Sequence, residues 1–206
     1  MDKDVADIDR YAGYVFKFIQ RYIQLTEQDF NKLIPYIEVR HFAKREQIVP
    51  FGQMDNYVNL VVKGLIRKYI QVGKFEKTLQ LATEGQLIQS ELSFHTRAPS
   101  SIIIEALEPS SVVSMNYDNV QHILETIPEA EQLARQLMTY LFIKKDARYF
   151  KQLKNTTRQR FLNYVTTHPQ MLQRVPQKIL ASYLDIKPET FSRLKHLLKD
   201  NPNAAG

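Results

Sequence analysis

Side chains suited to reading a nucleic acid are concentrated in one stretch near the C-terminus. After Pro188, the apolar residues Phe191 and Leu194 follow a helical period, which leaves the polar residues between them for the outer face of a helix. Arginine, glutamate and serine can hydrogen-bond to base edges, while lysine pairs with phosphates. We expect Arg193 to be the main base reader and Lys195 to contact a phosphate. The full set of candidate DNA-binding residues is Gln177, Lys187, Pro188, Glu189, Thr190, Ser192, Arg193 and Lys195.

Two short helices joined by a tight turn would position these side chains. Apolar residues at helical spacing mark one helix over residues 176–184 and a second from residue 188 to about residue 199. Small Ala181 lies where the helices must approach closely, and Pro188 suits a first helical position because its missing N–H would have no partner there. The pattern predicts a helix-turn-helix whose second helix can enter a major groove. An ordinary helical hairpin with solvated charges is the alternative.

The excess positive charge of the chain lies in the same region. Residues 151–206 contain 10 Lys or Arg and 3 Asp or Glu, whereas residues 1–150 contain 18 and 19, so the net charge of +6 comes from the C-terminal part. A basic module beside a neutral one suggests a unit that binds a polyanion, because cations gain most where they displace counterions from phosphates. On charge alone, a solvated basic face is the alternative.

Helical and then strand-like patterns fill the first 116 residues. The first forty residues are predicted to be helical, and Thr26 with Asp29 forms a variant of the capping box at one helix start. From about residue 42 the period changes to two, most clearly over residues 75–81, where we expect a half-buried strand with Phe75 on its apolar face. Turn residues predict successive hairpins that pair residues 57–62 with 65–70, the latter with the strand after Gly73, and 101–107 with 112–115. Such short strands favour a barrel, sandwich or roll.

A long helix with two apolar faces is predicted after the strands. A short helix over residues 117–126 ends before Pro128, and the long one covers residues 129–154. One of its faces carries Met138, Phe142 and Phe150. The simplest partners for two faces are the chain's own β-module and the same helix of a second subunit, although burial within one subunit is the alternative. The residues expected to form the dimer contact are Leu133, Leu137, Tyr140 and Leu141, and a charge at Leu137 is expected to produce monomers.

The fold class expected from these patterns is α+β, in three parts. Residues 1–128 would form an antiparallel β-roll with N-terminal helices, residues 129–154 a dimerisation helix, and residues 155–206 an all-α helix-turn-helix domain. Residues 155–157 are expected to form a break and an N-cap, and the helix that follows ends at His168 before a proline.

Three segments near the C-terminus, residues 173–177, 179–184 and 188–193, carry a specific resemblance: they are similar to the DNA-binding end of the Crp/Fnr family of bacterial transcription regulators. The resemblance covers nearly the whole chain. Gly52, Gly64 and Gly85 resemble turn glycines of its cyclic-nucleotide-binding β-roll, and residues 106–110 resemble the strand and turn that follow the phosphate cassette. The resemblance implies a jelly roll, a dimerisation helix and a helix-turn-helix. It also implies that Glu189 and Arg193 read bases, while Pro188 replaces an arginine that often does so.

The expected effector pocket departs from the family pattern. Its candidate residues are Gly85, Glu91, Leu92, Arg97, Ser100 and Ser101. Ser90 takes the place of the cassette's glycine, and Ser100 stands where nucleotide-binding members have an arginine. Arg97, three residues earlier, could compensate, or could pair locally with Glu91. We therefore expect no response to cyclic AMP or cyclic GMP, while an unknown small-molecule effector stays open.

The C-terminal region departs from the family at two places. Asp185 occupies a turn position usually held by glycine, a left-handed site that aspartate tolerates at some cost. Only residues 199–206 follow the second helix, which is too few for a two-stranded wing and predicts a wingless branch.

Other chemistries lack the residues that they need. The absence of cysteine excludes disulfides, thiolate nucleophiles and thiolate metal sites. The five histidines are scattered, and no Walker loop, nucleophile elbow or dinucleotide fingerprint is present, so no enzyme, cofactor or metal site is expected. Glu91 and His95 lie four apart, but a surface hydrogen bond explains that spacing. No apolar run could span a bilayer and the acidic start is unlike a secretory signal, so a cytoplasmic location is expected.

The sequence thus predicts a homodimeric, sequence-specific regulator that binds an inverted repeat in double-stranded DNA. The alternative is a β-roll that binds a small ligand or a protein and whose helix-turn-helix no longer binds DNA. The salt dependence of DNA binding separates the two, because phosphate contacts are lost steeply as salt rises.

Overall fold

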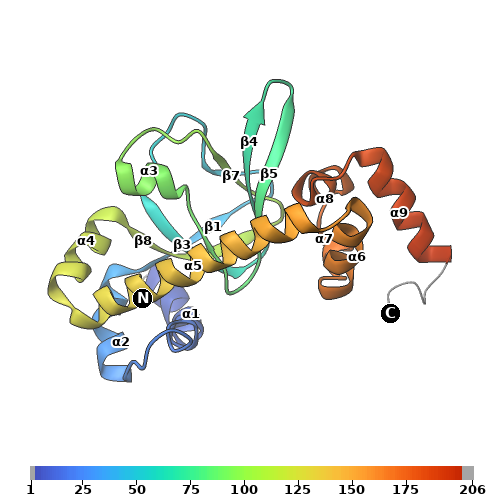
Figure 1. The fold of residues 1–206 in the computed structure, drawn as a ribbon. Helices are drawn as coiled ribbons and strands as arrows, with labels where there is room; N and C mark the ends of the chain where they lie inside the picture. Colours follow the sequence, from blue (N-terminus) through green and yellow to red (C-terminus); the bar gives the residue numbers. More distant parts are fainter. Residues whose placement is uncertain (1–2, 201–206) are drawn as a thin grey trace. The chain divides into compact units, whose positions relative to one another are not determined.

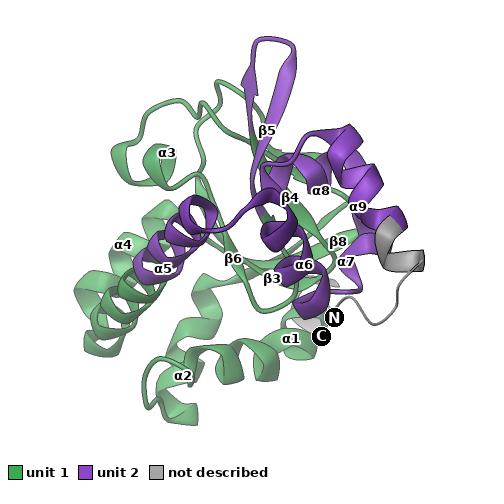
Figure 2. Cartoon of the chain, turned by 45° about the vertical axis from the view of Figure 1, so that its right-hand side comes forward, with its two compact units in different colours: residues 1–69, 81–141 green, residues 70–80, 142–206 purple. Residues whose placement is uncertain are grey.

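The computed structural model describes residues 3–200 of the 206-residue chain and the side chains of residues 7–196. The chain forms two compact units (Figure 2). The first comprises residues 1–69 and 81–141, and the second comprises residues 70–80 and 142–206. The boundary between the units therefore falls within the long helix, between residues 141 and 142. The predicted domain boundaries, at residues 128 and 154, lie at the two ends of that helix. The division into three functional parts stays a prediction.

The first unit is built mainly on antiparallel strands with helices around them, as predicted, while residues 70–80, the outer part of one hairpin, belong to the second unit (Figure 1). Two four-stranded sheets have the orders β1-β8-β3-β6 and β2-β7-β4-β5. The strands are β1 (Glu38–Phe42), β2 (Gln47–Val49), β3 (Tyr57–Lys63), β4 (Ile66–Val72), β5 (Phe75–Ala82), β6 (Leu87–Ile88), β7 (Ile103–Ala106) and β8 (Ser110–Asn116). The helical elements are α1 (Lys3–Ile19), α2 (Glu27–Leu33), the 3-10 turn η1 (Ile34–Tyr36), α3 (Glu91–Thr96) and α4 (Tyr117–Thr126).

Two of the expected hairpins are wrong, because their strands belong to different sheets. β3 pairs with β6 and β8 rather than with β4, and β7 pairs with β2 and β4 rather than with β8. The chain passes from one sheet to the other at Gly64, which has a φ of 99°. A Cβ at this position would lie 2.8 Å from the Cα of Ser110, so the corner needs glycine. Closure of the roll therefore selects the partners of these strands.

The hairpin of β4 and β5 is confirmed, but its expected apolar face is wrong near the turn. Phe75 is 78% exposed, whereas Thr78 is buried. Leu81 and Ala82, at the other end of β5, are buried as a core strand requires. The reason is that β5 belongs to two units. Residues 75–80 lie in the second unit and residues 81–82 in the first, so the side chains on one face of the strand do not all pack against the same core.

Two clusters of buried residues hold the first unit together. One lies between the two sheets and includes Phe42, Val61, Ile66, Ile104 and Val112. The other joins α1 and α2 to β3, β8 and the start of the long helix, through residues that include Phe18, Phe30, Leu60, Val113 and Ala130. Burial of this apolar surface is the main term that stabilises the roll.

The second unit contains the C-terminal helices. These are the C-terminal half of α5 (Pro128–Lys154), which runs as one continuous helix, followed by α6 (Thr157–Thr167), α7 (Met171–Arg174), α8 (Gln177–Leu184) and α9 (Pro188–Asp200) (Figure 1). The wingless end was predicted from residues 199–206, of which 201–206 lie outside the described residues. Within residues 3–200, no helix combines the length and the apolar character needed to cross a membrane.

The predicted helix starts are confirmed by their caps. Thr26 accepts a hydrogen bond from the backbone N–H of Asp29 at the start of α2. Thr156 and Gln159 form a reciprocal capping box at the start of α6. Each cap satisfies backbone donors that the first helical turn leaves without a partner.

Candidate functional site

The turn between α8 and α9 has the geometry that a helix-turn-helix requires. Asp185 adopts the left-handed conformation with φ 58° and ψ 49°, as predicted. The backbone N–H of Ile186 donates to the carbonyl oxygen of Ala181 at 2.9 Å, which closes the end of α8. Ala181 is fully buried, so the two helices do approach closely at this small residue.

Two phenylalanines form the centre of the helix-turn-helix core. Phe161 of α6 and Phe191 of α9 are 0% and 1% exposed. Their ring centroids lie 5.0 Å apart with an interplanar angle of 89°, an edge-to-face contact. Since Phe191 points inward, the turn-by-turn geometry of α9 directs the intervening polar residues outward.

Arg160 of α6 holds the turn through hydrogen bonds to the end of α8. Its Nε donates to the carbonyl oxygen of Leu184 at 3.0 Å, and its Nη2 donates to that of Asp185 at 2.8 Å. Another nitrogen of the same guanidinium donates to the carbonyl oxygen of Asn155 at 3.0 Å. These bonds join the start of α6 to the turn and satisfy carbonyl groups at the end of α8.

The predicted DNA-reading residues gather on and directly before α9, with Gln177 apart at the start of α8. Lys187, Pro188, Glu189 and Arg193 are exposed, while the following side chains are half-buried: Gln177, Thr190, Ser192 and Lys195. Arg193 donates a 3.4 Å hydrogen bond to Thr190 Oγ1, which lies one turn earlier. Among the described residues, Lys187 and Glu189 have no side-chain partner. The structure thus presents charged and hydrogen-bonding groups together on an open helical face.

In the β-roll, the expected effector pocket is occupied by contacts among its own residues. Lys68 Nζ donates to both carboxylate oxygens of Glu91, at 2.8 and 2.7 Å, and to the carbonyl oxygen of Gln89 at 3.0 Å. The Lys68 side chain is only 7% exposed. Lys68 is not among the predicted pocket residues, because its alternating strand position gives no signal of a charged partner 23 residues away.

The two serines of the cassette also bond to each other. Ser90 Oγ and Ser100 Oγ are hydrogen-bonded to each other at 2.8 Å, and both residues are buried. The backbone N–H of Ser90 donates to a carboxylate oxygen of Asp55 at 2.6 Å. Burial raises the pKa of Asp55, against the opposing effect of this bond. A backbone donor of the cassette is therefore already paired with an internal anion.

Arg97, the predicted substitute for the phosphate-binding arginine, makes contacts within the roll. It ends α3 in the left-handed conformation, and its guanidinium lies 4.0 Å from the ring centroid of Tyr117. It donates to the carbonyl oxygen of Asp55 at 3.2 Å and to Asn56 Oδ1 at 2.5 Å. The expectation that Glu91 pairs with Arg97 is wrong, because Lys68 takes that place.

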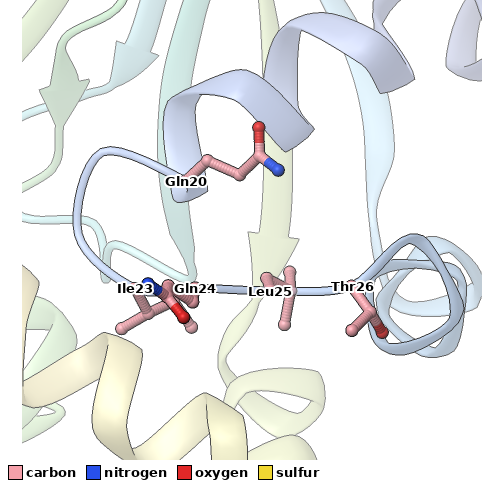
Figure 3. Close-up of a pocket in the computed structure, with 5 residues that line it drawn as sticks. All are labelled: Gln20, Ile23, Gln24, Leu25 and Thr26. Atoms are coloured by element: carbon pink, nitrogen blue, oxygen red, sulfur yellow. The ribbon is translucent and has the colours of Figure 1, made fainter.

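Of the remaining pocket candidates, one lies in a turn and two lie on the surface. Gly85 adopts a φ of 79°, as a turn glycine. Leu92 is 66% exposed and Ser101 is also exposed, so neither lines a closed pocket. A shallow depression of the first unit lies elsewhere, along the segment between α1 and α2, and is lined by Gln20, Ile23, Gln24, Leu25 and Thr26 (Figure 3). It holds no charged side chain and no predicted effector residue.

The structure assigns the two faces of α5 differently from the expectation. Leu133 and Leu137, expected at a dimer contact, pack against the core of the first unit. Tyr140 contacts Tyr22 edge to face, with ring centroids 5.3 Å apart, and Leu141 is half-buried. A charge at Leu137 would therefore disturb the chain's own core.

An exposed apolar stripe runs along the other side of α5. It consists of Met138, Phe142, Tyr149 and Leu153, which are 48%, 72%, 57% and 66% exposed. At about 100° per residue these four side chains share an arc of about 60° that faces away from Leu133 and Leu137. We call this set the exposed stripe.

No group of three or more metal-ligating residues is found among the described residues. Of the histidines, His41 bonds to Ser111 Oγ at 2.8 Å and to Asp7 at 2.9 Å, and His122 bonds to the hydroxyl of Tyr36 at 3.1 Å. These contacts are explained by local packing.

No protein-family model and no curated protein matches the sequence. The fold, however, is shared with solved regulators. CLP, the c-di-GMP responsive global regulator of Xanthomonas campestris, superposes with a TM-score of 0.68 at 12% identity, over 86% of this chain and 93% of that one. A regulator assigned to the Crp/Fnr family from Eubacterium rectale gives 0.64 at 14%, over 86% and 85%. The catabolite activator protein of Thermus thermophilus gives 0.51 at 20%, over 88% and 87%. The Crp/Fnr-like fold is thereby confirmed.

Proposed function

We propose that the protein is a sequence-specific DNA-binding transcription regulator of the Crp/Fnr type, acting in the cytoplasm and without catalytic activity. The observation that carries the proposal is the open face of α9, a helix held by a buried aromatic core, where Glu189 and Arg193 are exposed, with Lys187 exposed directly before it. The excess positive charge of residues 151–206 favours a polyanionic partner. The structural neighbours named above are regulators, which supports the same class.

We propose that the protein acts as a homodimer through the exposed stripe of α5. A single helix-turn-helix buries too little surface for strong specific binding, so such units usually act in pairs. Two-fold symmetry of the protein imposes the same symmetry on the contacts. The expected target is an inverted repeat whose half-sites lie about one helical turn, roughly 34 Å, apart.

The roles of individual residues follow from where they lie on α9. Arg193 has the length and the two parallel donors to bind guanine, and its contact with Thr190 orients it along the helix. Glu189 in the first turn can accept from cytosine, and Ser192 lies beside Arg193. Lys187 and Lys195 are assigned to phosphates, because an ammonium group on a flexible stem pairs well with a phosphate oxygen.

The function is tested by selecting bound sequences from random double-stranded DNA. The wild type should return an inverted repeat, and its affinity should fall steeply with salt, by a slope of about 0.9 per phosphate contact. Arg193→Ala should cost about 1–3 kcal/mol and relax the preference at one base pair per half-site.

The matched control is Arg158→Ala, which removes the same charge from an exposed position on α6. It should leave the selected sequence unchanged. Selection that returns no consensus, together with a flat salt dependence, would contradict DNA binding and favour a β-roll that works through a small ligand or a protein.

We also propose that the protein does not respond to cyclic AMP or cyclic GMP. A bound cyclic phosphate needs a charged donor, whose hydrogen bonds are worth about 1.5–3 kcal/mol against roughly 1 for a neutral one. Ser100 offers a hydroxyl that is already bonded, Arg97 is held by Asn56, and Lys68 is neutralised by Glu91. Losing about 3 kcal/mol weakens binding more than about a hundredfold.

Calorimetry with either nucleotide should therefore show no binding in the low-micromolar range. Ser100→Arg should not create a site, because Ser100 is 2% exposed and its hydroxyl donates to the carbonyl oxygen of Ile102 at 2.7 Å. Low-micromolar binding by the wild type would disprove this expectation, and Lys68→Met would then show whether Lys68 is the clamp.

A further inference from the structure

The outer part of the β4–β5 hairpin, residues 70–80, forms part of the second unit (Figure 2), and its β5 strand contacts the end of α8. Ser182 Oγ donates to the carbonyl oxygen of Glu76 at 2.9 Å and accepts from the backbone N–H of Thr78, also at 2.9 Å. One hydroxyl thus satisfies a donor and an acceptor on the same edge of β5. Such a bidentate contact fixes the position of the strand relative to the helix.

An ion pair adds a second contact, at the residue that directly follows α8. Lys77 Nζ pairs with a carboxylate oxygen of Asp185, the left-handed residue of the turn. Hydrogen bonding to Lys77 lowers the pKa of Asp185, against a smaller opposing effect of burial. Asp185, which stands where a glycine is usual, therefore supplies a carboxylate that pairs with Lys77 of the hairpin.

Arg148 of α5 provides a third contact. It donates to the carbonyl oxygen of Leu79 on β5 and, at 3.1 Å, to that of Tyr183 on α8. Its guanidinium carbon lies 3.9 Å from the ring centroid of Tyr183. One arginine thus joins three elements of the second unit, and its cation–π contact adds to the hydrogen bonds.

These contacts leave the reading face open. They use the end of α8 and the turn, whereas Lys187, Glu189 and Arg193 remain exposed beside them. Docking of the hairpin is therefore compatible with DNA in contact with α9.

We infer that the outer part of the β4–β5 hairpin, residues 70–80, is a third element of the DNA-binding unit, in which Lys77, Ser182 and Arg148 act as positioning residues for the turn that precedes α9. The inference rests on the proposed function. Because α9 starts three residues after Asp185, any freedom of this turn changes the direction in which α9 meets the groove. A helix-turn-helix without residues 70–80 would keep its reading residues but lose this orientation.

The absence of cysteine from the chain allows the contact to be switched by a single disulfide. Ser182 bonds to the backbone on both sides of Lys77, so these two positions lie next to each other across the contact. In Lys77→Cys/Ser182→Cys the reduced protein lacks the ion pair and the serine bonds, and oxidation restores the docked arrangement covalently. DNA affinity is measured on the same sample in both states.

We expect oxidation to give the disulfide in good yield on a non-reducing gel, and the oxidised protein to bind DNA as the wild type does. The reduced protein should bind at least about threefold more weakly, the loss expected for one exposed ion pair and two hydrogen bonds. The control Lys77→Ser/Ser182→Ala lacks the thiols and should bind weakly whether or not oxidant is present. Recovery on oxidation also excludes a direct contact of Lys77 with DNA, because the lysine is absent from both states.

Three results would overturn the inference while the wild type still binds DNA: no disulfide on oxidation, equal affinities in the two states, or weaker binding by the oxidised protein. If the double variant does not fold, Arg148→Met replaces it, and wild-type affinity in that variant would count against the inference. Failure of the wild type itself to bind DNA would reject the proposed function and this inference with it. The disulfide yield would still show whether the hairpin docks.

Discussion

Replacing Phe142 with aspartate is expected to turn a dimer into a monomer and to weaken binding to an inverted repeat at least about a hundredfold. In a dimer, the second helix-turn-helix is held close to the second half-site once the first is bound, and a monomer loses this advantage. Phe142 lies within the exposed stripe and is 72% exposed in the single chain. A charge buried between two such helices would have no partner, which disfavours association strongly. Light scattering measures the mass, and DNA titration measures the affinity.

The exposure of Phe142 makes the experiment specific for association. A substitution at such a surface position should change the free energy of unfolding by no more than about 0.5 kcal/mol. The matched control is Ala147→Asp, at another exposed position of α5 that lies roughly 120° around the helix from the nearest residue of the stripe. It should stay dimeric. A wild type that is monomeric at micromolar concentration, or a Phe142→Asp protein that remains dimeric, would rule out this surface.

Phe161→Ala is expected to lower the free energy of unfolding by about 3–5 kcal/mol and to abolish DNA binding at physiological temperature. Phe161 is fully buried and makes the edge-to-face contact with Phe191 that joins α6 to α9. The substitution removes a large apolar surface and leaves a cavity in a small helical core. Since a whole domain is stable by only about 5–15 kcal/mol, the loss is a large fraction of the total.

Urea unfolding followed by far-ultraviolet circular dichroism measures this effect. Phe51→Ala is the matched control, because it makes the same change at a side chain that is 66% exposed, and it should cost no more than about 0.5 kcal/mol. A loss of less than about 1 kcal/mol for Phe161→Ala would mean that α9 is not held by this core.

The sequence by itself determined those features that depend on residues within about one helical turn of each other. The caps at Thr26 and Thr156, the start of α9 at Pro188 and the left-handed Asp185 all lie where the pattern predicted them. Caps and turns are decided by hydrogen bonds between near neighbours, and the helical period of the core residues is likewise local. The helix-turn-helix, and the exposure of Glu189 and Arg193 on its second helix, could be predicted for this reason.

The tertiary structure alone decided which distant residues meet. Alternation identified the strands β3, β4, β7 and β8, but closure of the roll placed β3 and β4 in different sheets and did the same for β7 and β8. Apolar periodicity found two faces on α5, yet only packing showed that Leu137 belongs to the chain's own core.

The same limit applies to charged partners. Lys68 meets Glu91 across 23 residues, and Lys77 meets Asp185 across 108. Neither pair leaves a local signal, because a long charged side chain is compatible with an exposed strand position until the fold brings its partner within reach. Position in the three-dimensional fold, and not residue type, decided these contacts.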